Sequence, residues 1–337
     1  MKEALLYDRL ESGEVRCRLC RHGCRIKEGK RGICGVRSHT GGKLYTLVYD
    51  KVVSTNVDPI EKKPLYHFAP GSMSFSIATV GCNFRCSFCQ NYSISQMPHD
   101  RGHIIGEAFT PKQIVEMALH SQCRSISYTY TEPTVFYELA YDVMMEARDK
   151  GLLNVFVTNG YMSRDMLDHC RGLLDAANVD LKAFNDRFYL HYCKAQRSGV
   201  MDTLRYMKEL GIWVEVTTLL IPTLNDDPNE LRTMVRFIRD DLGPETPWHV
   251  SRFYPQYRET SLPPTAVSEL RRARQIGIEE GLRYVYTGNV PGEEGEKTFC
   301  PGCSKVVIDR VGYRIRTNVL SDGVCSYCGH HLEGVEM

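Results

Sequence analysis

The sequence predicts an α/β fold in which a partial (β/α)6-type barrel of parallel strands has small Cys-rich metal-binding modules at both termini. Short β-rich runs alternate with amphipathic helical stretches through the middle of the chain. Cysteines at metal-ligand spacing form clusters near both ends and after the first predicted barrel strand. The chain has 337 residues, of which 42% are hydrophobic and 25% charged, so it can bury a large core.

The barrel is predicted from seven strand-like runs and the helical stretches between them. The predicted strands are residues 74–80, 125–130, 153–158, 179–182, 213–220, 249–254 and 283–287. The predicted helices are residues 111–121, 133–150, 163–174, 200–210, 227–242 and 265–280. Thr110 is a candidate N-cap and Pro111 suits a first helical position. Six to seven such units indicate an open or partial barrel rather than a closed one of eight.

The composition divides the chain into three predicted domains. Residues 1–45 form a four-cysteine metal-binding segment, 46–290 the barrel, and 296–337 a module similar to a zinc ribbon or rubredoxin. Residues 43–53 are expected to form a small β region, and the Gly- and Glu-rich residues 291–297 a linker.

The charge pattern excludes several classes of function. The formal net charge is +1, and no basic stripe interleaved with aromatic residues is present, so a nucleic-acid partner is not expected. No apolar run approaches the roughly 18 residues of a membrane-spanning helix. The N-terminus has no long apolar core, which argues against a secretory signal. We expect a cytoplasmic protein without a membrane partner, with reduced thiols among its 14 cysteines.

The central cysteine trio predicts a reactive metal centre. Cys82, Cys86 and Cys89 have the spacing C-x3-C-x2-C directly after the first predicted barrel strand. Three thiolates can hold three irons of a [4Fe–4S] cube and leave the fourth iron without a protein ligand. An open position of this kind separates reactive metal sites from closed structural ones. The alternatives are a zinc site with a distant fourth ligand and a buried cluster of thiols.

Two further sets of four cysteines predict metal sites near the termini. The tail set has two C-x2-C pairs and suits a closed structural site for zinc or iron; the alternative is free thiols. Its members are Cys300, Cys303, Cys325 and Cys328. The N-terminal set suits zinc or, as the alternative, an auxiliary iron–sulfur cluster. Its members are Cys17, Cys20, Cys24 and Cys34.

The remaining cysteines are isolated in the sequence. Cys123, Cys170 and Cys193 are expected to be small buried residues. Cys193 follows the strand at residues 179–182, so a catalytic role as a hydrogen-atom donor in the cavity is its alternative.

The motifs resemble a known family. C-x3-C-x-aromatic-C on a partial barrel resembles the radical S-adenosylmethionine (SAM) superfamily. The segments at 22–24, 32–37, 81–91, 128–133, 159–161, 180–184 and 213–216 together resemble the AmmeMemoRadiSam system radical SAM enzymes, relatives of pyruvate formate-lyase activating enzymes. The resemblance covers nearly the whole chain.

The resemblance implies a chemistry. SAM would chelate the open iron through its amino and carboxyl groups, and one electron from the cluster would cleave its S–C5′ bond. The resulting 5′-deoxyadenosyl radical would abstract hydrogen from an unidentified small-molecule or protein substrate. The implied partners are a reductant such as flavodoxin or ferredoxin, and Memo-like and Ammecr-like proteins. The cofactor carries this chemistry, and the protein supplies orientation.

The residues that would hold SAM lie where predicted strands end, because the active sites of parallel barrels lie there. Glu132 stands where the family has Gly-Gly-Glu-Pro, which binds the ammonium group of SAM, although Tyr130 and Thr131 replace the glycines. A helix N-cap is its alternative role. Asp180 and Lys182 match the family's Asp-x-Lys, which contacts the ribose and carboxylate; a structural ion pair is the alternative.

Three more residues are candidates for contact with SAM. Phe88 stands where the family packs an aromatic side chain against adenine. Asn159 is expected either to contact the ligand or only to form a turn. His249 lies in the sixth strand, where a ligand contact competes with an ordinary structural role.

The leading function is therefore a radical SAM enzyme, an oxidoreductase or transferase. The alternative within the same chemistry is an activating enzyme that makes a glycyl radical on a partner protein. A metal-ribbon interaction protein and a plain electron carrier are the alternatives from other classes.

Overall fold

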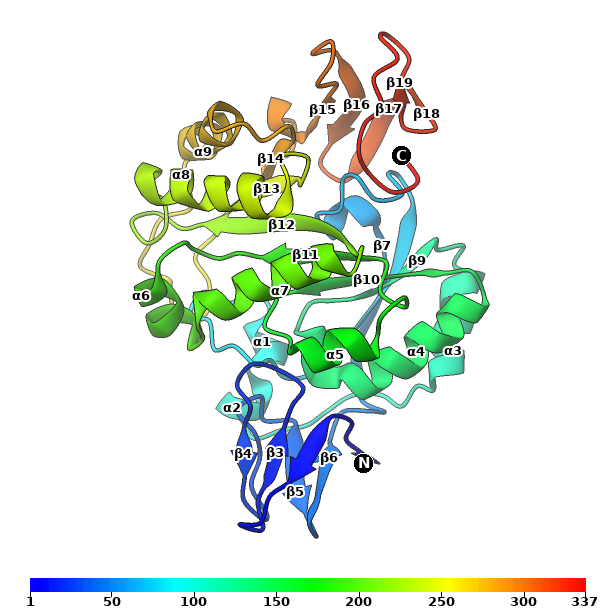
Figure 1. The fold of residues 1–337 in the computed structure, drawn as a ribbon, viewed down its shortest axis with the longest axis vertical. Helices are drawn as coiled ribbons and strands as arrows, with labels where there is room; N and C mark the ends of the chain where they lie inside the picture. The colour runs from blue at the N-terminus through cyan, green and yellow to red at the C-terminus, as the bar shows by residue number, and fades with distance from the viewer.

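An eight-stranded sheet forms the centre of the computed structural model, which describes residues 1–337 (Figure 1). Seven consecutive strands of the sheet are parallel, and β7 (Val52–Pro59) pairs antiparallel with β8 at one edge. The parallel strands are β8 (Met73–Thr79), β9 (Ser125–Tyr128), β10 (Leu153–Thr158), β11 (Ala176–Asp180), β12 (Trp213–Leu220), β13 (Trp248–Arg252) and β14 (Val285–Gly288). The edge strands β7 and β14 do not pair, so the barrel is partial, which confirms the predicted fold class.

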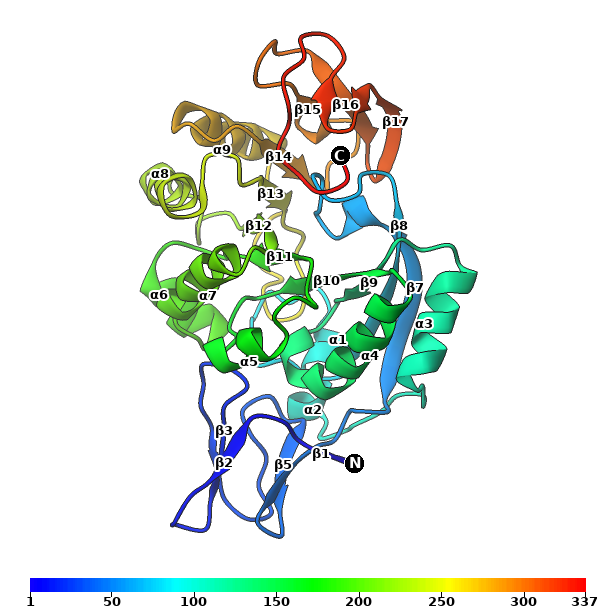
Figure 2. The same cartoon turned by 45° about the vertical axis from the view of Figure 1, so that its right-hand side comes forward.

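Helices cross over between consecutive parallel strands and cover the outer face of the sheet (Figures 1 and 2). They are α3 (Pro111–His120), α4 (Tyr137–Asp149), α5 (Arg164–His169), α7 (Arg197–Glu209), α8 (Pro228–Phe237) and α9 (Val267–Glu279). The predicted start of α3 is confirmed, because Thr110 and Gln113 form a reciprocal capping box and Pro111 is the first helical residue. None of the helices has the length and apolar character needed to cross a bilayer.

The N-terminal residues form two small antiparallel sheets at one end of the molecule (Figure 1). Their strands are β1 (Lys2–Glu3), β6 (Lys43–Thr46) and β5 (Arg37–Thr40) in one sheet, and β2 (Tyr7–Arg9), β3 (Val15–Cys17) and β4 (Arg25–Ile26) in the other. The expected β region at 43–53 is therefore two strands in different sheets, β6 and β7. Arg37 and Glu138 of α4 form a buried ion pair at 2.9 Å, which fixes these sheets against the barrel.

The C-terminal residues lie at the opposite end of the molecule. Their strands are β15 (Thr298–Phe299), β16 (Val306–Val311), β17 (Arg314–Asn318), β18 (Leu320–Ser321) and β19 (Val324–Cys325). Cys300, Val307 and Leu332 pack against Tyr284 and Tyr286 beside β14 in one apolar cluster. This contact covers the open edge of the barrel.

The expected linker at 291–297 is a folded segment rather than a free connection. Glu296 is only 2% exposed and accepts hydrogen bonds from the backbone N–H groups of Gly292 and Gly312. A buried carboxylate needs such donors, and here they join the segment to the turn between β16 and β17. The tail therefore has a defined position relative to the barrel.

Candidate active site

A cavity of about 500 Å³ opens at the carboxyl ends of the parallel strands. Its volume lies within the usual range of small-molecule sites, roughly 300–1,000 Å³. The structure brings eight of the predicted site residues to its walls: Cys82, Phe88, Cys86, Cys89, Glu132, Asn159, Asp180 and Lys182. Strand ends that are far apart in the sequence converge here because neighbouring parallel strands end at the same rim.

The cysteine trio lies in the loop that follows β8. Cys82 Sγ accepts a hydrogen bond from the backbone N–H of Phe84 at 3.3 Å, and Cys89 Sγ lies 3.2 Å from Ser95 Oγ. The three sulfur atoms do not all lie within 4.8 Å of one another, whereas those of the tail cysteines do. Burial raises the pKa of Cys82 and Cys89. A bound metal would stabilise their ionised form.

Glu132 lies at the start of the turn that leads into α4. It is fully buried, and its Oε1 accepts hydrogen bonds from Thr134 N at 3.1 Å and Thr158 Oγ1 at 2.8 Å. Burial raises the pKa of Glu132, and these hydrogen bonds oppose the shift. The capping role that the sequence left open is thus present, and the residue also lines the cavity.

Asn159 follows β10 in a tight turn. Its Nδ2 lies 3.6 Å from Cys82 Sγ and donates to Asn83 Oδ1 at 2.9 Å, so the side chain contacts the cysteine loop directly. Gly160 makes this turn possible: its φ is +67°, and a Cβ would lie 2.6 Å from Val179 Cγ1.

Asp180 and Lys182 form an ion pair at the end of β11. Lys182 Nζ lies 2.8 Å from Asp180 Oδ2, and the Lys182 side chain is 13% exposed. Burial favours a lower pKa for Lys182, but Asp180 and the thiolate of Cys86 raise it well above its usual value. Lys182 is therefore a fixed positive charge beside the cysteine trio.

Two further predicted residues are buried. Phe88 is 3% exposed and packs against Phe188, with 5.6 Å between ring centroids. Cys193 is fully buried and does not line the cavity. A hydrogen bond from Cys193 lowers the pKa of Cys86. The structure thus places Cys193 behind the cysteine trio and not on the open side.

His249, like Cys193, is a predicted site residue that does not line the cavity. Its Nε2 lies 2.6 Å from Glu215 Oε2, and its ring stacks on Tyr286. Glu215 also accepts hydrogen bonds from the backbone N–H groups of Tyr66 and His67. His249 lies two residues before Ser251, which lines the cavity from the same strand, so its side chain faces a deeper layer of the barrel. His249 therefore has the structural role that the sequence left open as the alternative to a ligand contact.

The sequence did not indicate three residues that line one part of the cavity, namely Lys62, Lys63 and Tyr313. Lys62 and Lys63 follow β7, which is the antiparallel strand that the βα pattern could not reveal. Tyr313 comes from the hairpin between β16 and β17, so the tail module reaches the cavity wall. In the sequence, only the two adjacent lysines in a short loop could have indicated that this segment reaches the site.

Lys63 belongs to a buried polar group at this side of the cavity. Its Nζ lies 2.6 Å from Asp58 Oδ2, and Tyr130 donates a hydrogen bond to the same oxygen. Burial lowers the pKa of Lys63 to about 8, although Asp58 opposes the shift. Tyr130 has a φ of +62°, so it keeps the left-handed backbone that a glycine would favour at this place.

The four tail cysteines form a compact group. All four sulfur atoms lie within 4.8 Å of one another, with 3.6 Å between Cys300 and Cys328 and 3.9 Å between Cys303 and Cys325. A tetrahedral ion with metal–sulfur bonds of about 2.3 Å separates its sulfur ligands by about 3.8 Å. The group can therefore hold one metal ion, and neither His330 nor His331 belongs to it.

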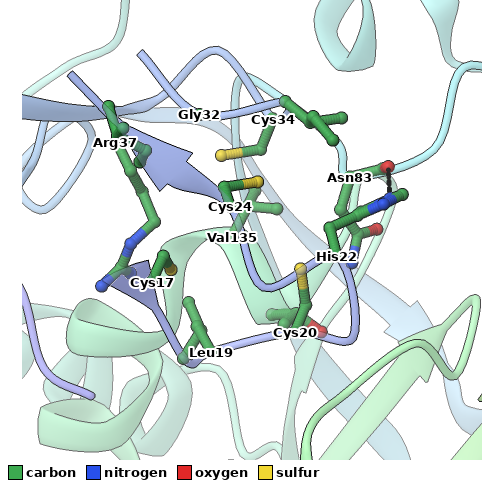
Figure 3. A pocket seen from close by; sticks show the side chains of 13 residues that line it. Cys17, Leu19, Cys20, His22, Cys24, Gly32, Cys34, Arg37, Asn83 and Val135 are labelled. Carbon is green, nitrogen blue, oxygen red and sulfur yellow. Dashed lines mark hydrogen bonds between the residues drawn. The ribbon is translucent and has the colours of Figure 1, made fainter. Parts of the chain in front are cut away.

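The N-terminal cysteines surround a separate cavity between the small sheets and the barrel (Figure 3). Its walls include Cys17, Cys20, Cys24 and Cys34. Asn83, the residue after Cys82, also lines it. The two predicted cysteine sites are thus neighbours.

Comparisons with known proteins agree with this geometry. Residues 76–238 match the model of the Radical SAM superfamily. An uncharacterized protein of Methanocaldococcus jannaschii is 47% identical over 337 residues, which cover 99% of each chain. The pyruvate formate-lyase-activating enzyme of Clostridium pasteurianum is 22% identical over 169 residues, covering 48% of this chain and 67% of the relative. The crystal structure of a radical SAM methyltransferase from Sphaerobacter thermophilus has a TM-score of 0.51 at 18% identity, covering 68% of this chain and 71% of that one.

The chain belongs to the radical SAM superfamily, and it is an enzyme of that superfamily. Its radical SAM domain is homologous to pyruvate formate-lyase activating enzymes. Membership implies a [4Fe–4S] cluster and SAM, and the cavity fits both. Two buried oxygens on its wall, Asn159 Oδ1 and Thr217 Oγ1, have no hydrogen-bond partner within the protein, as expected of groups that serve a ligand.

Proposed function

We propose that this protein is an AmmeMemoRadiSam-type radical SAM enzyme that cleaves SAM reductively and abstracts hydrogen from a substrate still to be identified. The supporting observation is the single cavity that joins the cysteine trio to Glu132, Asn159, Asp180 and Lys182. Cys82, Cys86 and Cys89 would hold a [4Fe–4S] cluster, which would supply one electron for cleavage of the S–C5′ bond of SAM to methionine and the 5′-deoxyadenosyl radical.

The cavity residues bind and orient SAM in this proposal. Glu132 presents a buried carboxylate for the ammonium group, and its contacts to the protein hold that carboxylate in one orientation. Lys182 is the cation for the SAM carboxylate, while Asp180, whose side chain is 36% exposed, accepts the ribose hydroxyls. Phe88 packs against adenine.

The part of the cavity that is lined by residues from β7 and from the tail hairpin is the proposed place of the substrate. Lys62, Lys63 and Tyr313 line it, and Asn289, which follows β14, also lines the cavity. Cations and hydroxyl groups there favour a substrate that carries polar or anionic groups. Both a small molecule and a protein side chain meet this requirement.

An activating enzyme for a glycyl-radical partner is the second candidate. The homology to pyruvate formate-lyase activating enzymes favours it. The replacement of the family's two glycines by Tyr130 and Thr131 argues against it, because Tyr130 fills space near Asp58 and Lys63. A reductant such as flavodoxin or ferredoxin serves either function, and Memo-like and Ammecr-like proteins are the proposed partners of the first, in the cytoplasm.

The tail cysteines are proposed to hold structural zinc. Four thiolates at single-ion spacing leave no open position for a reactant. The bound ion would order the hairpin that carries Tyr313, so the zinc site supports the cavity wall without taking part in the chemistry.

The proposed function is tested by anaerobic reconstitution with iron and sulfide, followed by reduction in the presence of SAM. We expect 5′-deoxyadenosine and methionine to form in the wild type and not in Cys86→Ala. Cys123→Ala, which changes an isolated cysteine outside the cavity, is the matched control and should retain the activity. Failure of the reconstituted wild type to cleave SAM would overturn the proposal.

A further inference from the structure

The N-terminal cysteines do not have the geometry of a single-ion site. No three of the sulfur atoms of Cys17, Cys20, Cys24 and Cys34 lie within 4.8 Å of one another, although all four side chains line one cavity. Figure 3 shows the four side chains around a common space. The tail cysteines, in the same chain, meet the 4.8 Å limit as a complete set of four.

This wider spacing is what an iron–sulfur cube requires. Each cysteine of such a site binds a different iron, so the body of the cube separates the sulfur atoms. The ligands of one zinc ion instead converge at about 3.8 Å from one another. The sulfur atoms of Cys82, Cys86 and Cys89 likewise do not form a group within the 4.8 Å limit. The N-terminal set therefore resembles the iron–sulfur ligands of this chain and not its compact tail site.

Two unpartnered donors point to a ligand in this cavity. Arg37 is 2% exposed, lines the cavity, and its Nε has no hydrogen-bond partner. Asn83 is 1% exposed, lines the same cavity, and its Nδ2 is also without a partner. Buried N–H donors rarely remain unpaired, and the sulfides of a cluster accept such hydrogen bonds.

The buried charge also suits an anionic cluster. Arg37 forms its ion pair with Glu138 through Nη1, so Nε is the part of its guanidinium left for the cavity. Arg37 lines the same cavity as Cys17 and Cys34, and its guanidinium is permanently charged. A fixed cation offsets part of the charge of four thiolates at a buried site.

The N-terminal cavity and the cysteine loop of the active site are directly connected. His22 Nε2 lies 2.8 Å from the backbone oxygen of Asn83, which follows Cys82 in the chain. Gly81, which precedes Cys82, has a φ of +104°, and a Cβ there would lie 2.6 Å from Val36 Cγ1 and 3.3 Å from the oxygen of Cys34. This close approach places the loop that carries Cys34 against the loop that carries Cys82. The contact between His22 and Asn83 also joins the N-terminal residues to the loop that carries Cys82.

We propose that Cys17, Cys20, Cys24 and Cys34 hold a second [4Fe–4S] cluster that lies within magnetic and electronic contact of the active-site cluster. All four of its irons have protein ligands, so it can store and pass on single electrons but cannot bind SAM. The electron comes from a one-electron donor such as reduced ferredoxin or flavodoxin, which is oxidised in turn. The assignment of the second cluster depends on the N-terminal residues alone. Its electron exchange with a SAM-binding cluster depends on the proposed function.

Metal analysis of the reconstituted full-length protein tests the second cluster. Each [4Fe–4S] cluster contributes four iron atoms, so the wild type should contain about eight per chain together with about one zinc. The variant Cys82→Ala/Cys86→Ala/Cys89→Ala should keep about half of this iron, with the Mössbauer spectrum of a cubane cluster. It leaves the N-terminal ligands intact, and Cys123→Ala is the control that should keep all of the iron. Loss of all iron from the triple variant, with two zinc ions per chain, would overturn the proposal.

Electron paramagnetic resonance of the reduced protein tests the contact between the clusters. The wild-type spectrum should be broadened by spin coupling relative to the sum of the spectra of the triple variant and of Cys17→Ser/Cys20→Ser. SAM should change the wild-type spectrum and leave the triple variant's unchanged. A wild-type spectrum equal to that sum would refute the contact. A triple variant that keeps its iron, beside a wild type that cannot cleave SAM, would refute the proposed function and leave the second cluster standing.

Discussion

The backbone N–H of Asn159 donates a hydrogen bond to Glu132 Oε2 at 2.9 Å, and it thereby joins the loop after β10 to the loop after β9. Asn159 in turn contacts Cys82 through its side chain. A carboxylate proposed to bind SAM therefore also positions a residue that contacts the cysteine loop. A change at Glu132 is therefore expected to affect both SAM binding and the structure of the site.

Glu132→Gln should weaken SAM binding and also lower stability. The carboxamide loses the negative charge and turns an N–H₂ group toward the donors of Thr134, Thr158 or Asn159. Removing one partner of a buried charged pair typically costs about 2–5 kcal/mol, or roughly 30- to 4,000-fold in affinity.

Isothermal titration of SAM into the cluster-loaded variant measures the first effect and thermal unfolding the second. Glu116→Gln, an exposed residue on α3, is the matched control and should change neither. Unchanged SAM affinity in Glu132→Gln would move this residue from binding to structure alone.

Asp180→Ala should weaken SAM binding more than Lys182→Ala. Loss of Asp180 removes the proposed ribose acceptor and also leaves the buried ammonium of Lys182 beside Cys86 without its carboxylate. Loss of Lys182 leaves Asp180, whose side chain is 36% exposed, in contact with water, so its cost should be smaller. We expect an affinity loss of at least roughly 30-fold for Asp180→Ala, by titration of SAM at equal iron content. Equal affinity in this variant and the wild type would assign the pair to barrel packing.

Cys303→Ala should remove the tail metal and destabilise the protein. The tail packs on Tyr284 and Tyr286, so its disorder exposes apolar surface at the open edge of the barrel. We expect a loss of about one metal ion per chain and a fall in Tm of roughly 5 °C or more.

SAM cleavage should persist in Cys303→Ala below its unfolding temperature, because no tail cysteine lines the cavity. Cys123→Ala again serves as the control for loss of a thiol. Selective loss of SAM cleavage in a folded, metal-replete Cys303→Ala would contradict a structural role.

Acid should destabilise the protein through His67. Burial lowers the pKa of His67 to about 4, and its ring is held between the backbone oxygen of Glu333 and the hydroxyl of Tyr286. In the unfolded chain the pKa is about 6.5, so between these values only the unfolded state binds the proton. The contribution of His67 to the free energy of unfolding is therefore constant above about pH 6.5. It falls by roughly 3 kcal/mol between about pH 6.5 and pH 4.

Denaturant unfolding at a series of pH values measures this slope. His67→Gln should be less stable than the wild type at pH 8 but should show a flatter acid limb. His103→Gln, which changes an exposed histidine, should reproduce the wild-type slope. An acid limb of unchanged steepness in His67→Gln would exclude this residue as the source.

Much of the fold and the core of the site could be predicted from sequence. The runs at 153–158 and 213–220 coincide with β10 and β12, because buried parallel strands are short and apolar and are separated by helices of regular length. The cysteine trio and the carboxylate and lysine positions lie at strand ends, where the topology of a parallel barrel brings them together.

Other features depended on contacts between distant segments. His249 has the same strand pattern as a cavity residue, but the neighbouring Glu215 and Tyr286 place it in a polar network one layer deeper. Lys62, Lys63 and Tyr313 reach the cavity from an antiparallel strand and from the tail hairpin, which no local periodicity connects.

The class of fold and three candidate sets of metal ligands follow from the sequence alone, since periodicity and cysteine spacing are local properties of the chain. The distances between the sulfur atoms of each set depend on how the distant parts of the chain pack together. Cys300 and Cys328 are 3.6 Å apart, whereas the N-terminal set opens around a cavity. The reason is that C-x2-C spacing suits either a zinc ion or an iron–sulfur cube, and the packing of the surrounding backbone sets the space between the ligands.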